Sequence, residues 1–145
     1  MFQFLKKMFE KKNPLISTLK DDHQKLFELY KYLLDETEKN NFANVQNGVK
    51  KFVNEYNKHI LLEDTQLYVA LEEKYKDRKT ILRTIKDIEK DMDAITRAIK
   101  FFEKKYSLIN YENRDIFLEE LKYIGQVLTD RVKLEEERLY PLLDS

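Results

Sequence analysis

The side chains best suited to chemistry in this sequence are two histidines and two glutamates that share a helical spacing. His23 and His59 are the only histidines, and each falls in a series of positions spaced three and four residues apart. Glu63 follows His59 by four residues, so on a helix the two side chains lie one turn apart on the same face. Glu135 has an equivalent place near the end of the chain. Imidazole and carboxylate groups in this mixture suit iron, manganese or zinc.

Long helices are needed to position these residues. The 145-residue chain has 2 Gly and 2 Pro, with both prolines near its ends, and this composition predicts uninterrupted helices with short connections. We predict four long helices separated by connections at about 40–41, 76–79 and 107–113. Asn13 and Pro14 are typical of a helix start. The predicted fold class is all-α, an up-down-up-down four-helix bundle over residues 13–145.

Each predicted helix has an inner stripe of side chains. In chain order the stripes are Leu19, His23, Leu26, Tyr30 and Leu33; Val49, Phe52, Tyr56, His59, Glu63, Gln66 and Ala70; Ile81, Ile85, Ile88, Met92, Ile95, Ile99 and Phe102; and Phe117, Leu121, Ile124, Leu128, Arg131, Glu135 and Leu139. His23 and His59 each lie 18 residues from Asn41 in the first turn. Because every helical residue rises about 1.5 Å, we expect the two histidines to meet at one depth.

Three segments of the chain resemble a known family. DDHQKLFELYKYL, HILLEDTQLY and KLEEERLYPLL are similar to the hemerythrin-like HHE cation-binding domains, and the resemblance spans residues 14 to 143. It implies a four-helix bundle that holds a non-haem iron pair through inward histidines and bridging carboxylates. Carried over by motif, the metal-ligand positions are His23, His59, Glu63 and Glu135. Members of the family carry or sense oxygen, handle iron, or repair iron centres.

Two departures from the family pattern change the expected site. Ile88 or Met92 stands where the third helix of the family offers a histidine, and Arg131 stands where the fourth helix has His-x-x-x-Glu. A guanidinium repels a nearby dication in a poorly screened interior. We therefore expect one iron ion or none, rather than a full pair.

Arg131 leaves two interpretations open. In the first, a single metal is held by the two histidines and Glu63, with Glu135 as a further ligand and Arg131 on its outer side as a tuning charge. In the second, the planar guanidinium neutralises both glutamates and takes the place of the metal, and the buried ion network is retained for packing specificity.

A narrower resemblance supports the second interpretation. The segment YIGQVLTDRVKLEEERL is similar to the last helix of the Rsd/AlgQ family of sigma-factor regulators, which implies a metal-free bundle that binds a sigma factor. The first interpretation instead predicts a non-catalytic metal-binding sensor or regulatory module that signals to a protein partner. Tyr30 and Tyr56 are candidate hydrogen-bond donors to the histidines, or else core residues.

Composition excludes several other functions. The sequence has no Gly-rich phosphate loop and no HExxH motif, and none of its serines has an inward histidine to activate it, so we expect no enzyme activity. The 27 basic and 27 acidic residues balance, which argues against nucleic acid as a partner. No apolar run is long enough for stable membrane insertion, and the absence of Cys is typical of the cytoplasm.

The first twelve residues form a separate predicted segment. MFQFLKKMFEKK places apolar and basic side chains on opposite sides of a helix and lacks the features of a signal peptide. We expect it to cap the bundle, to form a homodimer contact, or to dock on a membrane surface or a partner.

Overall fold

The structure is a computed structural model that describes residues 13–144. The predictions made for residues 1–12 lie outside that range. The helical elements are α2 (Pro14–Glu38), α3 (Phe42–Leu62), η1 (Glu63–Leu67), α4 (Tyr68–Lys74), α5 (Lys79–Lys105), α6 (Arg114–Leu134), η2 (Glu135–Leu139) and α7 (Tyr140–Asp144). No strand occurs among the described residues.

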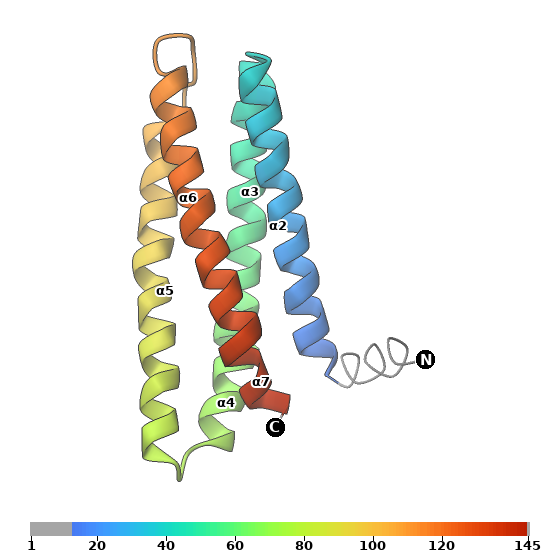
Figure 1. The fold of residues 1–145 in the computed structure, drawn as a ribbon, viewed down its shortest axis with the longest axis vertical. Helices are drawn as coiled ribbons and strands as arrows, with labels where there is room; N and C mark the ends of the chain where they lie inside the picture. The colour runs from blue at the N-terminus through green and yellow to red at the C-terminus, as the bar shows by residue number, and fades with distance from the viewer. Residues whose placement is uncertain (1–12, 145) are drawn as a thin grey trace.

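These elements form four helical rods, and each rod runs antiparallel to the one before it in the chain (Figure 1). The first rod is α2, the second runs through α3, η1 and α4, the third is α5, and the fourth runs through α6, η2 and α7. The rod of α2 packs against α3 and α6, while α5 packs against α3 and α4. The α2–α3 turn and the α5–α6 loop lie at one end of the bundle, and the α4–α5 turn lies at the other (Figure 1). The predicted up-down-up-down bundle is confirmed.

Local sequence signals explain where the first rod begins and ends. The side chain of Asn13 accepts hydrogen bonds from the backbone N–H groups of Leu15 and Ile16, at 3.0 and 3.4 Å, and Pro14 is the first helical residue. This is the predicted start, in which Asn satisfies free donors and Pro needs none. In the turn that follows, Asn40 adopts a left-handed conformation with φ of 59°, which asparagine tolerates better than most residues.

The second and fourth rods each contain one π-helical turn, and both turns begin at an inward glutamate. In η1 the N–H of Tyr68 bonds to the carbonyl of Glu63, and in η2 the N–H of Tyr140 bonds to the carbonyl of Glu135. Each bond therefore spans five residues instead of the usual four. A single wide turn shifts the inward register of all residues that follow it.

This shift corrects part of the predicted stripe of the second helix. Gln66 is exposed and Ala70 is only half-buried, whereas Leu67 and Leu71 are buried in their place. The physical reason is the π turn at Glu63, which inserts one extra residue and moves the inner face forward by one position. The stripe as predicted holds up to Glu63.

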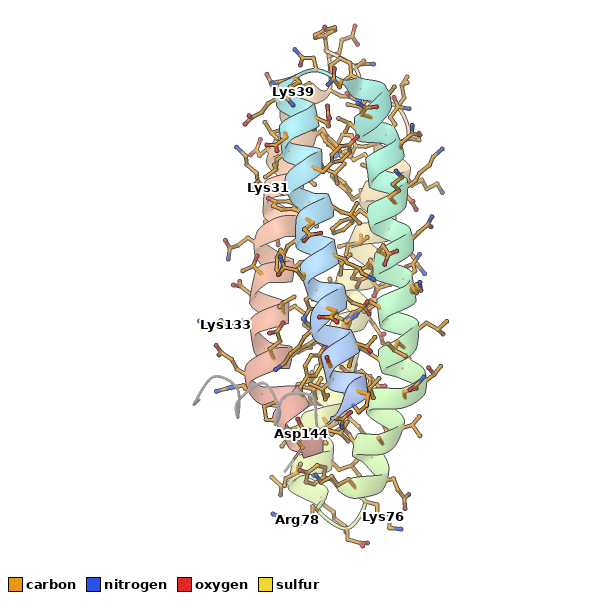
Figure 2. The ribbon with its side chains drawn as sticks, turned by 90° about the vertical axis from the view of Figure 1, so that its right-hand side faces the viewer. Lys31, Lys39, Lys76, Arg78, Lys133 and Asp144 are labelled. Atoms are coloured by element: carbon orange, nitrogen blue, oxygen red, sulfur yellow. The ribbon has the colours of Figure 1, made fainter. Side chains whose placement is uncertain are left out.

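The core consists of two apolar clusters. One contains Leu26, Phe52, Tyr56 and Leu128, and the other contains Leu19, Leu67 and Leu139, each with further neighbours. Buried polar residues lie between the clusters: His23 is placed between Leu19 and Leu26 along α2, and Arg131 follows Leu128 along α6. Charged side chains such as those of Lys31 and Lys133 point outward from the bundle (Figure 2).

Gly125 lies in the middle of α6, where the bundle is tightly packed. A Cβ atom at this position would clash with the ring of Tyr30, which reaches across from α2. The close approach of a neighbouring helix explains why glycine stands here despite its cost of about 1 kcal/mol in a helix interior.

Candidate metal centre

The two histidines meet inside the bundle, as their equal distance from the first turn predicts. Their ring centroids are 4.7 Å apart, and both side chains are almost fully buried. His23 comes from α2, and His59 comes from the last turn of α3, immediately before the π turn. Helices of different rods therefore bring the two imidazoles to one point.

Both imidazoles are oriented from outside by carboxylates. Nδ1 of His23 lies 2.7 Å from Oε2 of Glu136, and Nδ1 of His59 lies 3.1 Å from Oδ2 of Asp22. Since an ionised carboxylate only accepts hydrogen bonds, each Nδ1 is the donor. This leaves the Nε2 atoms directed toward the centre of the bundle, which is the arrangement in which protein histidines bind metals.

Glu63 and Glu135 face the same point from the second and fourth rods. Oε1 of Glu135 lies 2.9 Å from Nε2 of His23, and Oε2 of Glu63 lies 3.5 Å from Nε2 of His59. One ligand atom from each of the four residues falls within a group whose members are at most 4.8 Å apart. The structure thus assembles all four residues that the sequence predicts as metal ligands.

This arrangement fits a metal ion. Bonds of about 2.0–2.2 Å to nitrogen and oxygen place opposite ligands of one ion about 4.0–4.4 Å apart, so the four atoms need to contract by only a few tenths of an ångström. Among the described residues, Nε2 of His59 and Oε1 of Glu63 are buried without a hydrogen-bond partner. Buried polar atoms without partners are costly, and an ion bound by His59 and Glu63 would reduce this cost.

Arg131 lies on the other side of Glu135. Its Nε donates to Oε2 of Glu135 at 3.1 Å, Nη1 donates to the carbonyl of Ile88 at 2.8 Å, and Nη2 donates to the hydroxyl of Tyr68 at 2.9 Å. The prediction that this guanidinium binds a carboxylate is confirmed for Glu135. It has no hydrogen bond to Glu63, contrary to the suggestion that it neutralises both glutamates through direct contact.

The carboxylates and the cations control one another's protonation. Burial alone would raise the pKa of Glu135, but hydrogen bonds from the histidines and the charge of Arg131 lower that pKa overall. Burial raises the pKa of Glu63, which the guanidinium does not contact. Burial would lower the pKa of His59, yet the carboxylates of Glu135, Glu63 and Asp22 raise it to about 10. The centre therefore attracts positive charge.

The two tyrosines proposed as donors to the histidines lie outside this network. The hydroxyl of Tyr56 bonds to Oγ1 of Thr96 at 2.8 Å, and Tyr30 packs against Gly125. Tyr56 is a buried member of the apolar cluster that contains Leu26 and Phe52, and Tyr30 packs against the same cluster, which agrees with the alternative interpretation given for them.

Two other tyrosines, which the sequence interpretation missed, do contact the site. The hydroxyl of Tyr140 lies 2.9 Å from Oε2 of Glu63 and 3.1 Å from Nε2 of His23, and Tyr68 binds Arg131. An internal repeat could have revealed them, because Leu-Glu-x-x-x-Leu-Tyr occurs at 62–68 and again at 134–140. Each copy contains one π turn and one of these tyrosines: Tyr68 contacts Arg131, and Tyr140 contacts the glutamates.

A four-helix bundle that directs two imidazoles and two carboxylates to one buried point belongs to the class of helical-bundle metal proteins. The family model of the hemerythrin HHE cation-binding domain matches residues 15–143. The chain belongs to this family, and the matched range contains the four candidate ligands together with Arg131 and Tyr140. A search of curated proteins and a search of solved structures each found no match. In the described residues no helix is long and apolar enough to cross a membrane.

Proposed function

We propose that this hemerythrin-family domain binds a single iron ion through His23, His59, Glu63 and Glu135. The observation that carries the proposal is that one possible ligand atom from each of the four residues lies within 4.8 Å of the others, while Nε2 of His59 and Oε1 of Glu63 are buried without a hydrogen-bond partner. Mixed nitrogen and oxygen ligands of this kind suit iron. When bound, the ion supplies a redox-active, ligand-binding cation to the interior of the bundle.

The stoichiometry of one ion follows from Arg131. Arg131 precedes Glu135 by four residues just as His59 precedes Glu63, so the guanidinium stands at the position equivalent to that of the candidate ligand His59. Its three donors engage Glu135, the carbonyl of Ile88 and Tyr68. A fixed cation there disfavours a second metal ion by charge repulsion. The carboxylate of Glu135 lies between this guanidinium and the site of the single ion that we propose.

The role we propose for the ion is sensing rather than turnover. The four ligand side chains are buried, and an apolar cluster lies on each side of them, which leaves little room for an organic substrate. A change in the ion's state would alter the positions of ligands on three of the rods, and a protein partner in the cytoplasm would read the altered surface.

A metal-free interaction module is the second candidate, because the guanidinium of Arg131 is satisfied without any ion. In that case protonated His59 supplies the positive charge, and a sigma factor or another protein is the partner. In this candidate the ion pair between Nε2 of His59 and Oε2 of Glu63 stays long, at 3.5 Å, and Oε1 of Glu63 keeps no hydrogen-bond partner, so we rank it below the iron site.

Elemental analysis after expression with iron, manganese and zinc supplements separates the two candidates. We expect about one iron per chain in the wild type, lost on His59→Ala because a ligand is removed. Lys58→Ala, at an exposed position beside it, is the matched control and should retain the metal. Near-zero metal in the wild type would refute the iron site and favour the metal-free module.

A further inference from the structure

The hydroxyl of Tyr140 lies inside the group of candidate ligand atoms. It is 2.9 Å from Oε2 of Glu63, 3.1 Å from Nε2 of His23 and 3.2 Å from Oε1 of Glu135, and the residue is 1% exposed. Its ring stacks on that of His23, with a centroid distance of 5.7 Å and an interplanar angle of 14°. We propose that Tyr140 is a fifth ligand, whose phenolate oxygen binds ferric iron. The inference rests on the proposed iron site.

The three distances are those expected between neighbouring ligands of one ion. With bonds of about 2.0–2.2 Å, adjacent ligand atoms lie about 3 Å apart. Hydrogen bonding alone cannot satisfy all of these contacts, because the tyrosine hydroxyl has one proton to share between the carboxylate oxygens of Glu63 and Glu135. A cation among these oxygens removes the conflict.

The π turn is what brings Tyr140 to this position. In a regular α-helix, five residues correspond to about 500°, so Tyr140 would lie about 140° around the helix from Glu135. In η2 the N–H of Tyr140 instead bonds to the carbonyl of Glu135, and the wider turn places both residues on the inner face. Pro141 follows and has no N–H with which to continue the hydrogen-bond ladder.

The second copy of the repeat shows that the position alone does not make a ligand. Tyr68 follows Glu63 by five residues across the other π turn, but its hydroxyl accepts a hydrogen bond from Nη2 of Arg131. Tyr140 faces histidine and glutamate atoms and no guanidinium. The two copies thus differ: Tyr68 is hydrogen-bonded to Arg131, whereas Tyr140 is directed to the candidate ligands.

The coordination step is a proton exchange. Ferric iron bonds to the phenolate oxygen, the O–H bond of Tyr140 breaks, and one proton is released to solvent; no electron is transferred. Phenolate bound to ferric iron has a strong charge-transfer absorption in visible light, which imidazole and carboxylate ligands do not provide. The spectrum therefore distinguishes a ligand from a residue that only hydrogen-bonds to the ligands.

The experiment loads metal-free protein with ferric citrate, removes unbound iron, and records iron content and the visible spectrum. We expect wild-type protein to bind iron and to be coloured, Tyr140→Phe to lose the band, and Tyr56→Phe to keep it. Tyr56 is an equally buried tyrosine whose hydroxyl binds Thr96. If Tyr140 only formed hydrogen bonds to the ligands, Tyr140→Phe would lower iron affinity about 10- to 100-fold, but the iron-loaded wild type would show no such band.

Two results would overturn the inference separately from the proposed function: wild-type protein that binds iron without the band, or a Tyr140→Phe variant that keeps it. Wild-type protein that binds no iron would overturn both. Resonance Raman spectroscopy of the iron-loaded wild type needs no variant and serves if Tyr140→Phe does not fold. Ring vibrations of a bound phenolate support the inference, and their absence contradicts it.

Discussion

At the scale of single residues, the character of the centre depends on Arg131. The guanidinium is buried and bonded to Glu135, and this neighbour raises the pKa of Arg131 although burial opposes the shift. It is therefore a permanent charge. It compensates one carboxylate and leaves Glu63 for an ion, which explains how a buried site can contain two histidines, two glutamates and a cation together.

Replacing this residue tests whether it limits the number of ions. We expect Arg131→His to raise iron content above that of the wild type, because an imidazole removes the fixed charge and supplies a ligand. Arg131→Lys is the control, since it keeps a cation and should not raise the content. The measurement is iron per chain by elemental analysis. If Arg131→His and wild-type protein hold the same amount, the arginine does not limit binding.

At the scale of elements, the two π turns place the glutamates and tyrosines on one face. A π turn contains one residue more than an α turn needs. Deleting an exposed residue within it should restore a regular helix while Glu135 and Tyr140, then four apart, remain on the same face. In contrast, a deletion in the regular part of α6 rotates all later residues by about 100°.

This contrast gives a pair of deletions. Removing Glu137, an exposed residue of η2, should keep the free energy of unfolding within about 1 kcal/mol of the wild type. Removing Lys133, an exposed residue of α6, should cost about 3 kcal/mol or more, because Leu139 and Tyr140 leave the core. Urea unfolding measures both. If both deletions lowered the free energy of unfolding equally, the π turn would not tolerate loss of a residue better than the regular helix does.

At the scale of the whole molecule, helix periodicity predicted most of the fold. Spacings of three and four residues identified the inner faces of all four rods, and counting from the first turn brought His23 and His59 together. Both inferences depend on regular repeats, which a sequence displays directly. The sequence also contains a sign of the register shift. Leu67 and Leu71 are apolar, and each lies one position after the predicted inner residues Gln66 and Ala70.

Contacts between rods were less predictable than positions along them. The carbonyl of Ile88 and the hydroxyl of Tyr68 hold Arg131, and Tyr140 reaches Glu63 across the bundle. Such contacts depend on how two further loops and two wide turns set the heights of the rods. The local pattern of any one helix does not contain this information. The sequence therefore predicted Glu63 and Glu135 as carboxylate partners for Arg131, of which only Glu135 is hydrogen-bonded to it.

Anaerobic titration of metal-free protein with ferrous iron, monitored by calorimetry, measures how many ions the buried histidines and glutamates bind. A single site formed by His23, His59, Glu63 and Glu135 predicts saturation at about one ion per chain, and weak or no binding by Glu63→Gln, because the amide lacks the negative charge of the ligand. Absence of binding by the wild-type chain, or saturation at about two ions, would contradict this single site.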